Sequence, residues 1–220
     1  MWPTTADELI REQEKLARAT PPLFRPSGVV AIGGCFVCFA RAKTGHGDAG
    51  DLGWAGAAVL RREGAVVTGK AGAPYQPALL ALREGALLEA AVRNLAEQPD
   101  LLLVNATGRD HPRRAGLALH LGAVLELPTI GITHRLLLAE GEWPADEQGA
   151  TSPFQLESER VGYWLRTRRG MRPLAVHAAW RTDAETAVRL VSGILGTKRT
   201  PEPLREARRL ARTARAETAL

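Results

Sequence analysis

The residues best suited to chemistry lie in the middle of the chain, in short segments rich in proline, glycine and arginine. Pro-Tyr-Gln-Pro occupies 74–77 and is followed by Arg-Glu-Gly at 83–85. The segment 105–114 then reads Asn-Ala-Thr-Gly-Arg-Asp-His-Pro-Arg-Arg. The tyrosine offers an aromatic ring to a ligand, and neighbouring guanidinium groups suit bidentate contacts with phosphate, so the arginines are compatible with a polyanionic partner. The same tyrosine could instead pack on the protein surface, and the arginines could be solvated.

The distribution of charge favours the same class of ligand. The chain carries 29 Lys and Arg against 24 Asp and Glu, and residues 161–220 alone have a net charge of +8. Residues 1–160 have a net charge of −3. A basic carboxy-terminal third favours a polyanionic partner such as DNA or RNA, although solvated helix faces in an arginine-rich protein would give the same count.

The sequence predicts one cytoplasmic domain over residues 1–220 with no membrane partner. No apolar run approaches the roughly 18–20 residues of a membrane-spanning helix, and the first twenty residues contain no apolar signal core. The two cysteines, Cys35 and Cys38, are too few for a disulfide framework. On a strand they would point to opposite faces, so we expect them to pack in the core.

Hydrophobic periodicity predicts an antiparallel meander that is followed by alternating helices and strands. This order is typical of an α/β, ribonuclease-H-like fold, with a mixed β-sheet flanked by helices. The predicted elements are an amino-terminal helix within 1–20, a strand at 29–40, a hairpin at 53–72, a helix at 78–97, a strand at 101–105, a helix opened by Pro112, a strand at 128–133, an irregular excursion at 139–158, a strand pair within 161–179, a helix at 183–195 and a basic helix at 200–216.

Several of these segments resemble the endonuclease V family, the deoxyinosine 3′ endonucleases. The resemblance is carried by 74–85, by DLLLVNATGRDHPRRAGLALHLG at 100–122, by LPTIGIT at 127–133 and by TPEPLREARRLA at 200–211. It covers nearly the whole chain. It implies a ribonuclease-H-like fold and metal-dependent cleavage of nucleic acid near deaminated purines, mainly inosine.

The resemblance also implies that most of the metal-binding carboxylates are replaced. The family's first-strand Asp matches Phe36, and the Asp of its Asp-Gly-His-Gly loop matches Asn105. The ligand after Pro-Glu-Pro matches Arg208, and a family lysine matches His134, so Glu84 is the retained carboxylate. Mg²⁺ needs several converging oxygen ligands. We therefore expect no metal cofactor, with Glu84, Asn105 and His134 as weak candidate ligands and Mg²⁺ as the cofactor of an active form.

The nucleic-acid contacts implied by the resemblance lie in two loops. The tyrosine of 74–77 corresponds to a wedge that fills the gap left by a displaced base, and residues 105–108 correspond to the wall that accepts this base. Free N–H groups and guanidiniums at the start of the helix opened by Pro112 would hold phosphate. The expected nucleic-acid-binding residues are Tyr75, Ala106, Gly108, His111, Arg113 and Arg114.

Three functional hypotheses follow. The first is a catalytically degenerate nuclease that still binds DNA or RNA, either single-stranded or inosine-containing. The second is a weak metal-dependent endonuclease that uses Glu84, Asn105, His134 and Asp110, acting on inosine-containing strands. A set of Glu84, His111 and His134 would instead suit Zn²⁺. The third is a protein-interaction module on the same fold.

Overall fold

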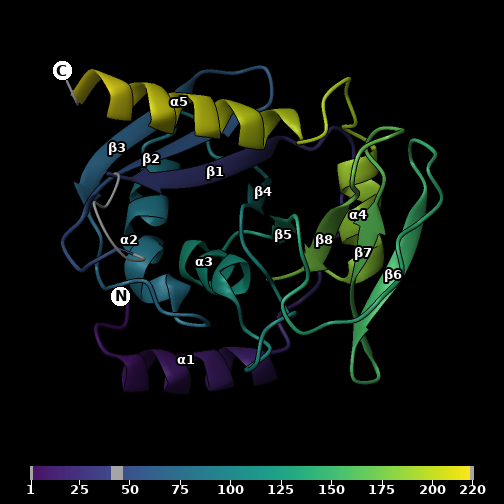
Figure 1. Cartoon of the computed structure of the whole chain (residues 1–220), viewed down its shortest axis with the longest axis horizontal. Coiled ribbons are helices and arrows are strands. Elements are labelled where there is room, and N and C mark those ends of the chain that lie inside the picture. Colours follow the sequence, from purple (N-terminus) through teal and green to yellow (C-terminus); the bar gives the residue numbers. More distant parts are fainter. Residues whose placement is uncertain (1, 41–46, 219–220) are drawn as a thin grey trace.

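The computed structural model describes residues 2–40 and 47–218, whose helices and strands form one mixed sheet covered by helices (Figure 1). The strands are β1 (Ile32–Phe39), β2 (Leu52–Val59), β3 (Gly64–Lys70), β4 (Leu101–Val104), β5 (Thr129–Thr133), β6 (Thr151–Leu156), β7 (Glu159–Leu165) and β8 (Leu174–Ala178). The helices are α1 (Ala6–Arg18), α2 (Leu80–Arg93), α3 (Leu117–Leu125), α4 (Ala184–Ser192) and α5 (Glu202–Thr218). None of these described helices is long and apolar enough to cross a membrane.

The strands follow the order β3-β2-β1-β4-β5-β8-β7-β6 across the sheet. β1, β2 and β3 pair antiparallel, whereas β4 runs parallel to both β1 and β5. The pairs β5–β8, β8–β7 and β7–β6 are antiparallel. This arrangement confirms the predicted α/β fold, in which an antiparallel meander precedes parallel strands. Because β4 and β5 are parallel neighbours, the segments that follow them leave the sheet at the same edge.

The amino-terminal helix predicted within 1–20 is α1, which is stabilised by a capping box. Thr5 Oγ1 accepts a hydrogen bond from the backbone N–H of Glu8 at 3.3 Å, and the Glu8 carboxylate accepts one from the N–H of Thr5. These bonds satisfy two donors that the first helical turn leaves free. Leu9 and Leu16 are buried on the inner face of α1, together with Gln13, a polar residue that reaches the site described below.

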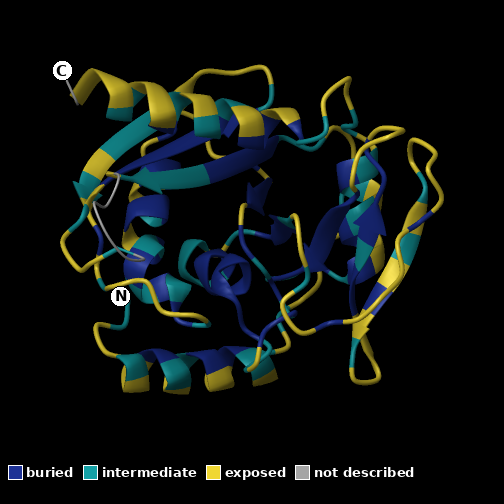
Figure 2. Ribbon diagram, viewed as in Figure 1, coloured by how far each residue is buried: buried dark blue, intermediate teal, exposed yellow. Residues whose placement is uncertain are grey.

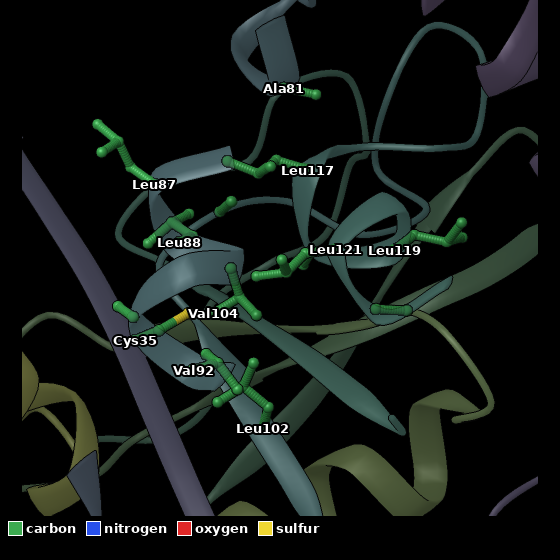
Figure 3. Packing of buried hydrophobic residues seen from close by; sticks show 14 of the residues in the cluster. Cys35, Ala81, Leu87, Leu88, Val92, Leu102, Val104, Leu117, Leu119 and Leu121 are labelled. Atoms are coloured by element: carbon green, nitrogen blue, oxygen red, sulfur yellow. The ribbon is translucent and has the colours of Figure 1, made fainter. Parts of the chain in front are cut away.

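The hydrophobic core lies on both faces of the sheet. The side chains of β4 alternate, so Leu102 and Val104 pack with α2 and α3 while Leu101 and Leu103 pack with α4 and α5. Figure 3 shows Cys35 beside the first pair, against leucines of α2 and α3. The central strands are therefore buried on both faces, whereas the outer face of α5 is exposed to solvent (Figure 2).

The two cysteines point to opposite faces of β1, as the strand period predicts. Cys35 is fully buried on the α2 side, and burial raises the pKa of its thiol. Cys38 faces α5, where its Sγ lies 3.5 Å from the carbonyl oxygen of Ala211. The pair therefore packs against two different helices.

The prediction of an irregular excursion at 139–158 is wrong for its second half. Thr151–Leu156 forms β6, the edge strand beside β7, and Phe154 is fully buried against Val161 and Trp164. The strand escapes a periodicity search because Phe154 and Leu156 are its only apolar positions besides Pro153, a residue that sheets tolerate at an edge.

The helix predicted to open at Pro112 begins instead at Leu117. Residues 110–116 form turns, in which Pro112 is exposed and Asp110 is fully buried. The Asp110 carboxylate accepts hydrogen bonds from the N–H groups of Leu137, Leu138 and Ala139 at 2.7–2.8 Å. Asp110 therefore anchors the segment after β5 rather than a helix start.

Helix α5 packs on β1 and β2 with almost no side chain between the two backbones. A Cβ atom at Gly34 of β1 would lie 2.7 Å from the backbone of Pro203 and Leu204. A Cβ atom at Gly56 of β2 would collide with the carbonyl oxygen of Ala207. Glycine at these two positions lets the helix approach the sheet closely, which fixes where the arginines of α5 lie.

We predict that Gly56→Ala lowers the free energy of unfolding by about 1–3 kcal/mol, the usual cost of overpacking a site whose neighbour is backbone. The matched control is Gly196→Ala, because a Cβ atom there meets nothing within 4 Å. The control should stay within about 0.5 kcal/mol of wild type. Chemical denaturation followed by circular dichroism measures both, and equal stabilities for the two variants would contradict this packing.

Candidate nucleic-acid site

A pocket of about 440 Å³ opens at the sheet edge where β4 and β5 end. One wall is the loop before α2, which includes Tyr75 and Pro77. The opposite wall is formed by Asn105 and Ala106 after β4 and by Leu137 after β5. Polar and apolar groups therefore face one another across a space large enough for a planar heterocycle.

The loop that carries Tyr75 is held by the carbonyl oxygen of Ala78. This oxygen accepts hydrogen bonds from His111 Nε2 at 3.1 Å, Arg113 Nη2 at 3.0 Å and Gln13 Nε2 at 3.3 Å. Ala78 has φ +61°, a left-handed conformation that is strained for a residue with a Cβ atom. Three donors on one carbonyl offset that strain and fix the loop beside the pocket.

His111 is a structural residue of this network. Its Nδ1 accepts a hydrogen bond from the N–H of Arg113 at 3.2 Å, so its Nε2 carries the proton that is donated to Ala78. Burial lowers the pKa of His111 to about 4, which keeps the ring neutral near pH 7. Both ring nitrogens are therefore engaged within the protein.

The arginines predicted to hold phosphate have partners within the protein. Arg113 Nε donates to Gln13 Oε1 at 2.6 Å, which ties the turn after β4 to α1. Arg114 pairs with Glu157 at 2.9 Å and with Glu159 at 3.4 Å. Direct phosphate contacts by these two residues stay a prediction, and the helix start that was expected to assist them lies further along the chain.

The other predicted binding residues divide between the pocket and the core. Tyr75 lines the pocket and is 43% exposed, and Ala106 also lines the pocket but is buried. Gly108 does not line the pocket. A Cβ atom at Gly108 would collide with the carbonyl oxygen of Ala178, so this glycine serves close packing against β8.

Three positions predicted to have lost metal ligands meet in space. The guanidinium of Arg208 lies over the Phe36 ring, with Cζ 5.0 Å from the ring centroid. Arg208 Nη2 also donates to Asn105 Oδ1 at 3.4 Å. Arg212, one helical turn further along α5, lies 5.9 Å from the same ring. The sequence analysis did not name Arg212. Its position four residues after Arg208 on a predicted helix indicates that the two side chains lie on the same face.

Glu84 is a residue of α2, the helix that covers the face of the sheet opposite α5. Burial raises the pKa of Glu84 to about 7, against a smaller lowering by Arg83. Its negative charge also contributes to the raised pKa of Cys35, whose neighbour Phe36 points the other way along the strand, toward α5. Asp51 pairs with the buried Arg83 at 2.7 Å.

These side chains do not fit a Mg²⁺ ion. Mg²⁺ needs oxygen ligands in near-octahedral geometry, and the three meeting positions offer an aromatic ring, a neutral amide and a cation. His134 as a whole is exposed, but partial burial of its ring lowers the pKa, and the positive charges of Arg199 and Arg208 lower it further. In the described parts of the chain, no three His, Cys, Asp or Glu side chains form a group that could hold a metal ion.

An antiparallel meander, two further parallel strands and helices on both faces define a ribonuclease-H-like domain. The Endonuclease V sequence model matches residues 25–209. An Endonuclease V from Gloeobacter violaceus is 34% identical over 211 residues, which cover 94% of this chain and 85% of that protein. The chain belongs to the Endonuclease V family.

Solved structures of the family share this fold. The Endonuclease V of Streptomyces avermitilis superposes with a TM-score of 0.85 at 31% identity, covering 100% of this chain and 96% of that one. The Endonuclease V of Ciona intestinalis, at 23% identity and a TM-score of 0.78, covers 96% of this chain and 98% of its own. That protein was crystallised in complex with a 24-mer DNA containing an inosine followed by a ribo-adenosine.

We predict that Glu84→Gln stabilises the protein above pH 7 and leaves it nearly unchanged near pH 4.5. The folded-state pKa of Glu84 is raised from its ordinary 4.5 to about 7, so wild type loses stability as pH rises between these values. The gain of the variant at pH 8.5 should be about 1–3 kcal/mol.

Urea unfolding at pH 4.5 and pH 8.5 measures this difference, with the exposed Glu147→Gln as control. The control should change by less than about 0.5 kcal/mol at both pH values. A Glu84→Gln variant that is less stable than wild type at pH 8.5 would show that the ionised carboxylate has a stabilising partner.

Proposed function

We propose that this protein is a nucleic-acid-binding member of the Endonuclease V family that has lost the cleavage chemistry. The observation that carries the proposal is the contact of Arg208 with both Phe36 and Asn105. Three positions that match the family's metal ligands adjoin one another here and hold a ring, an amide and a fixed positive charge, whereas Glu84, the retained carboxylate, lies on α2 across β1. Their proximity supports the residue-by-residue correspondence that the resemblance suggested.

Electrostatics opposes a divalent cation at this place. Arginine stays protonated at any physiological pH, so Arg208 repels a metal ion that would have to bind against Asn105. Phe36 occupies volume beneath that guanidinium and offers no oxygen. Glu84 has a pKa of about 7 and would lose part of its charge near neutral pH. One such carboxylate is a poor substitute for several converging ones.

Features that serve binding are retained. The pocket at the end of β4 and β5 has room for a base, and Tyr75 stands exposed at its wall. The neighbouring loop is held by the three donors on the Ala78 carbonyl. The inosine-containing DNA bound by the Ciona protein, which shares the fold, makes an inosine-containing single strand the natural first probe.

The rival hypothesis of a weak metal-dependent endonuclease loses one of its four candidate ligands. Asp110 uses its two carboxylate oxygens to accept three backbone hydrogen bonds and is fully buried. His134 is within the electrostatic influence of Arg199 and Arg208. The third hypothesis, a protein-interaction module, predicts no oligonucleotide binding at all. Measuring the binding of an inosine-containing single strand therefore distinguishes it from the proposed function.

We predict that Tyr75→Ala weakens binding of an inosine-containing single strand by about 1–3 kcal/mol, the usual contribution of an aromatic side chain stacked on a base. The slope of log Kd against log salt should not change, since the tyrosine neutralises no phosphate. Fluorescence anisotropy measures both quantities. Trp143→Ala removes an aromatic residue that is 53% exposed outside the pocket and should bind as wild type does. Equal affinity of all three proteins would exclude stacking by Tyr75.

We predict that millimolar Mg²⁺ does not raise the melting temperature of wild type. A ligand at a hundredfold over its Kd stabilises by about 2.7 kcal/mol, which a thermal scan detects. The combined variant Phe36→Asp, Asn105→Asp, Arg208→Asp should gain a saturable Mg²⁺-dependent increase. A saturable increase in wild type itself would overturn the proposal that the metal chemistry is lost.

A further inference from the structure

A row of arginines lies along the side of α5 that is next to the pocket. Arg205, Arg208, Arg209 and Arg212 follow the i, i+3, i+4, i+7 spacing of one helical face, and they line an open groove of about 450 Å³. The groove adjoins the pocket through Asn105, whose amide lines the pocket and accepts a hydrogen bond from Arg208. A strand with its base in the pocket would therefore pass close to this row.

The acidic residues of α5 pair with only one arginine of this row in the described part of the chain. Glu206 pairs with Arg209 at 2.6 Å, and Glu202 faces the turn between β2 and β3 together with Glu206. Arg205, Arg208 and Arg212 form no ion pair with a carboxylate in residues 2–40 and 47–218. Three guanidinium groups thus remain available for an external anion.

Two of these guanidiniums are held together over one ring. Arg208 and Arg212 both lie over Phe36, at 5.0 and 5.9 Å from its centroid. Their mutual repulsion, with burial as the larger cause, lowers the pKa of Arg208. The Nε–H of Arg208 is buried and has no hydrogen-bond partner in the described part of the chain. A bound anion would relieve the repulsion between the two guanidiniums.

We propose that Arg208 and Arg212, supported by the Phe36 ring, form a metal-independent site for one backbone phosphate of the strand whose base enters the pocket. This inference rests on the proposed function and names the chemical group that the altered site binds. Guanidinium groups supply the positive charge and the planar donors that phosphate needs. They activate no water molecule, so the phosphodiester is held and not cut.

The first test measures binding of a fluorescent, inosine-containing single strand in EDTA over a range of salt concentrations. Arg208→Gln and Arg212→Gln should each bind about tenfold more weakly, as expected when a charge-assisted contact is lost. Because both guanidiniums hold the same phosphate, the double variant Arg208→Gln, Arg212→Gln should reduce the log–log salt slope by about 0.7, the value for one phosphate contact on a single strand, and each single variant should reduce it by less. Arg189→Gln, which removes an exposed arginine from α4, is the matched control and should change neither quantity.

A second test locates the phosphate. Single methylphosphonate linkages, which are uncharged, are placed in turn at each position flanking the inosine. Wild type should lose about tenfold in affinity at one position, and the double variant Arg208→Gln, Arg212→Gln should show no further loss at that same position. Arg208→Lys should restore the slope but only part of the affinity, because lysine keeps the charge and lacks the fork of donors.

The outcomes separate the two proposals. If wild type binds the strand in EDTA while the Arg208 and Arg212 variants match Arg189→Gln in affinity and slope, the phosphate site is wrong and the proposed function stands. If wild type binds no oligonucleotide even at low salt, the proposed function fails and the phosphate site fails with it. Thermal melts of every variant establish that an altered affinity reflects the site, and Arg212, an exposed residue, provides a variant with little effect on the core.

Discussion

The contact between α5 and the first two strands determines how the rest of the site is built. Gly34 and Gly56 leave no Cβ atom between the helix and the sheet, so the two backbones meet directly. A helix held this closely cannot rotate or slide without a clash, because interiors are close-packed. Its register then places Arg208 over Phe36 and against Asn105. Gly56 is the cross-strand partner of Phe36, and Gly34 lies two residues before Phe36 on the same face of β1, so the close approach of α5 occurs at the place where Arg208 meets the ring.

The pocket depends on a second, independent constraint at the Ala78 carbonyl. Donors from α1 and from the turn after β4 converge there, so three segments far apart in sequence position one loop. On the opposite wall, Asp110 fixes the segment that carries Leu137 through backbone hydrogen bonds. Buried polar groups are therefore used here to shape a surface, since each is satisfied only when the segments it connects are in place. His111 and Arg113 were expected to touch nucleic acid. Their hydrogen bonds instead hold the loop of Ala78 that forms one wall of the pocket.

A change of charge at one place has opposite consequences for two ligands. A carboxylate cluster concentrates divalent cations and repels a phosphodiester until metal is bound. The arginines of α5 invert this situation, since they repel metal and attract the phosphodiester directly. Glu84, buried on the other side of β1, is left with a raised pKa that disfavours its charged form. The fold is that of the Endonuclease V family, and under the proposed function the charge of this site holds a strand without cutting it.

Sequence alone determined the elements with strong periodicity and the family to which the chain belongs. The meander followed by alternating helices and strands, the opposite facing of Cys35 and Cys38, and the basic helix near the carboxy end follow from patterns of two and 3.6 residues and from the charge count. Local patterns failed for Thr151–Leu156, because an edge strand needs few apolar residues, and for the start of α3 at Leu117, because Asp110 bonds across the chain instead of capping a helix. Only the tertiary structure decided that Arg208 meets Phe36 and Asn105, and that His111 and Arg113 turn inward to Ala78. Such contacts join residues separated by tens to more than a hundred positions, and their geometry depends on packing that no local pattern records.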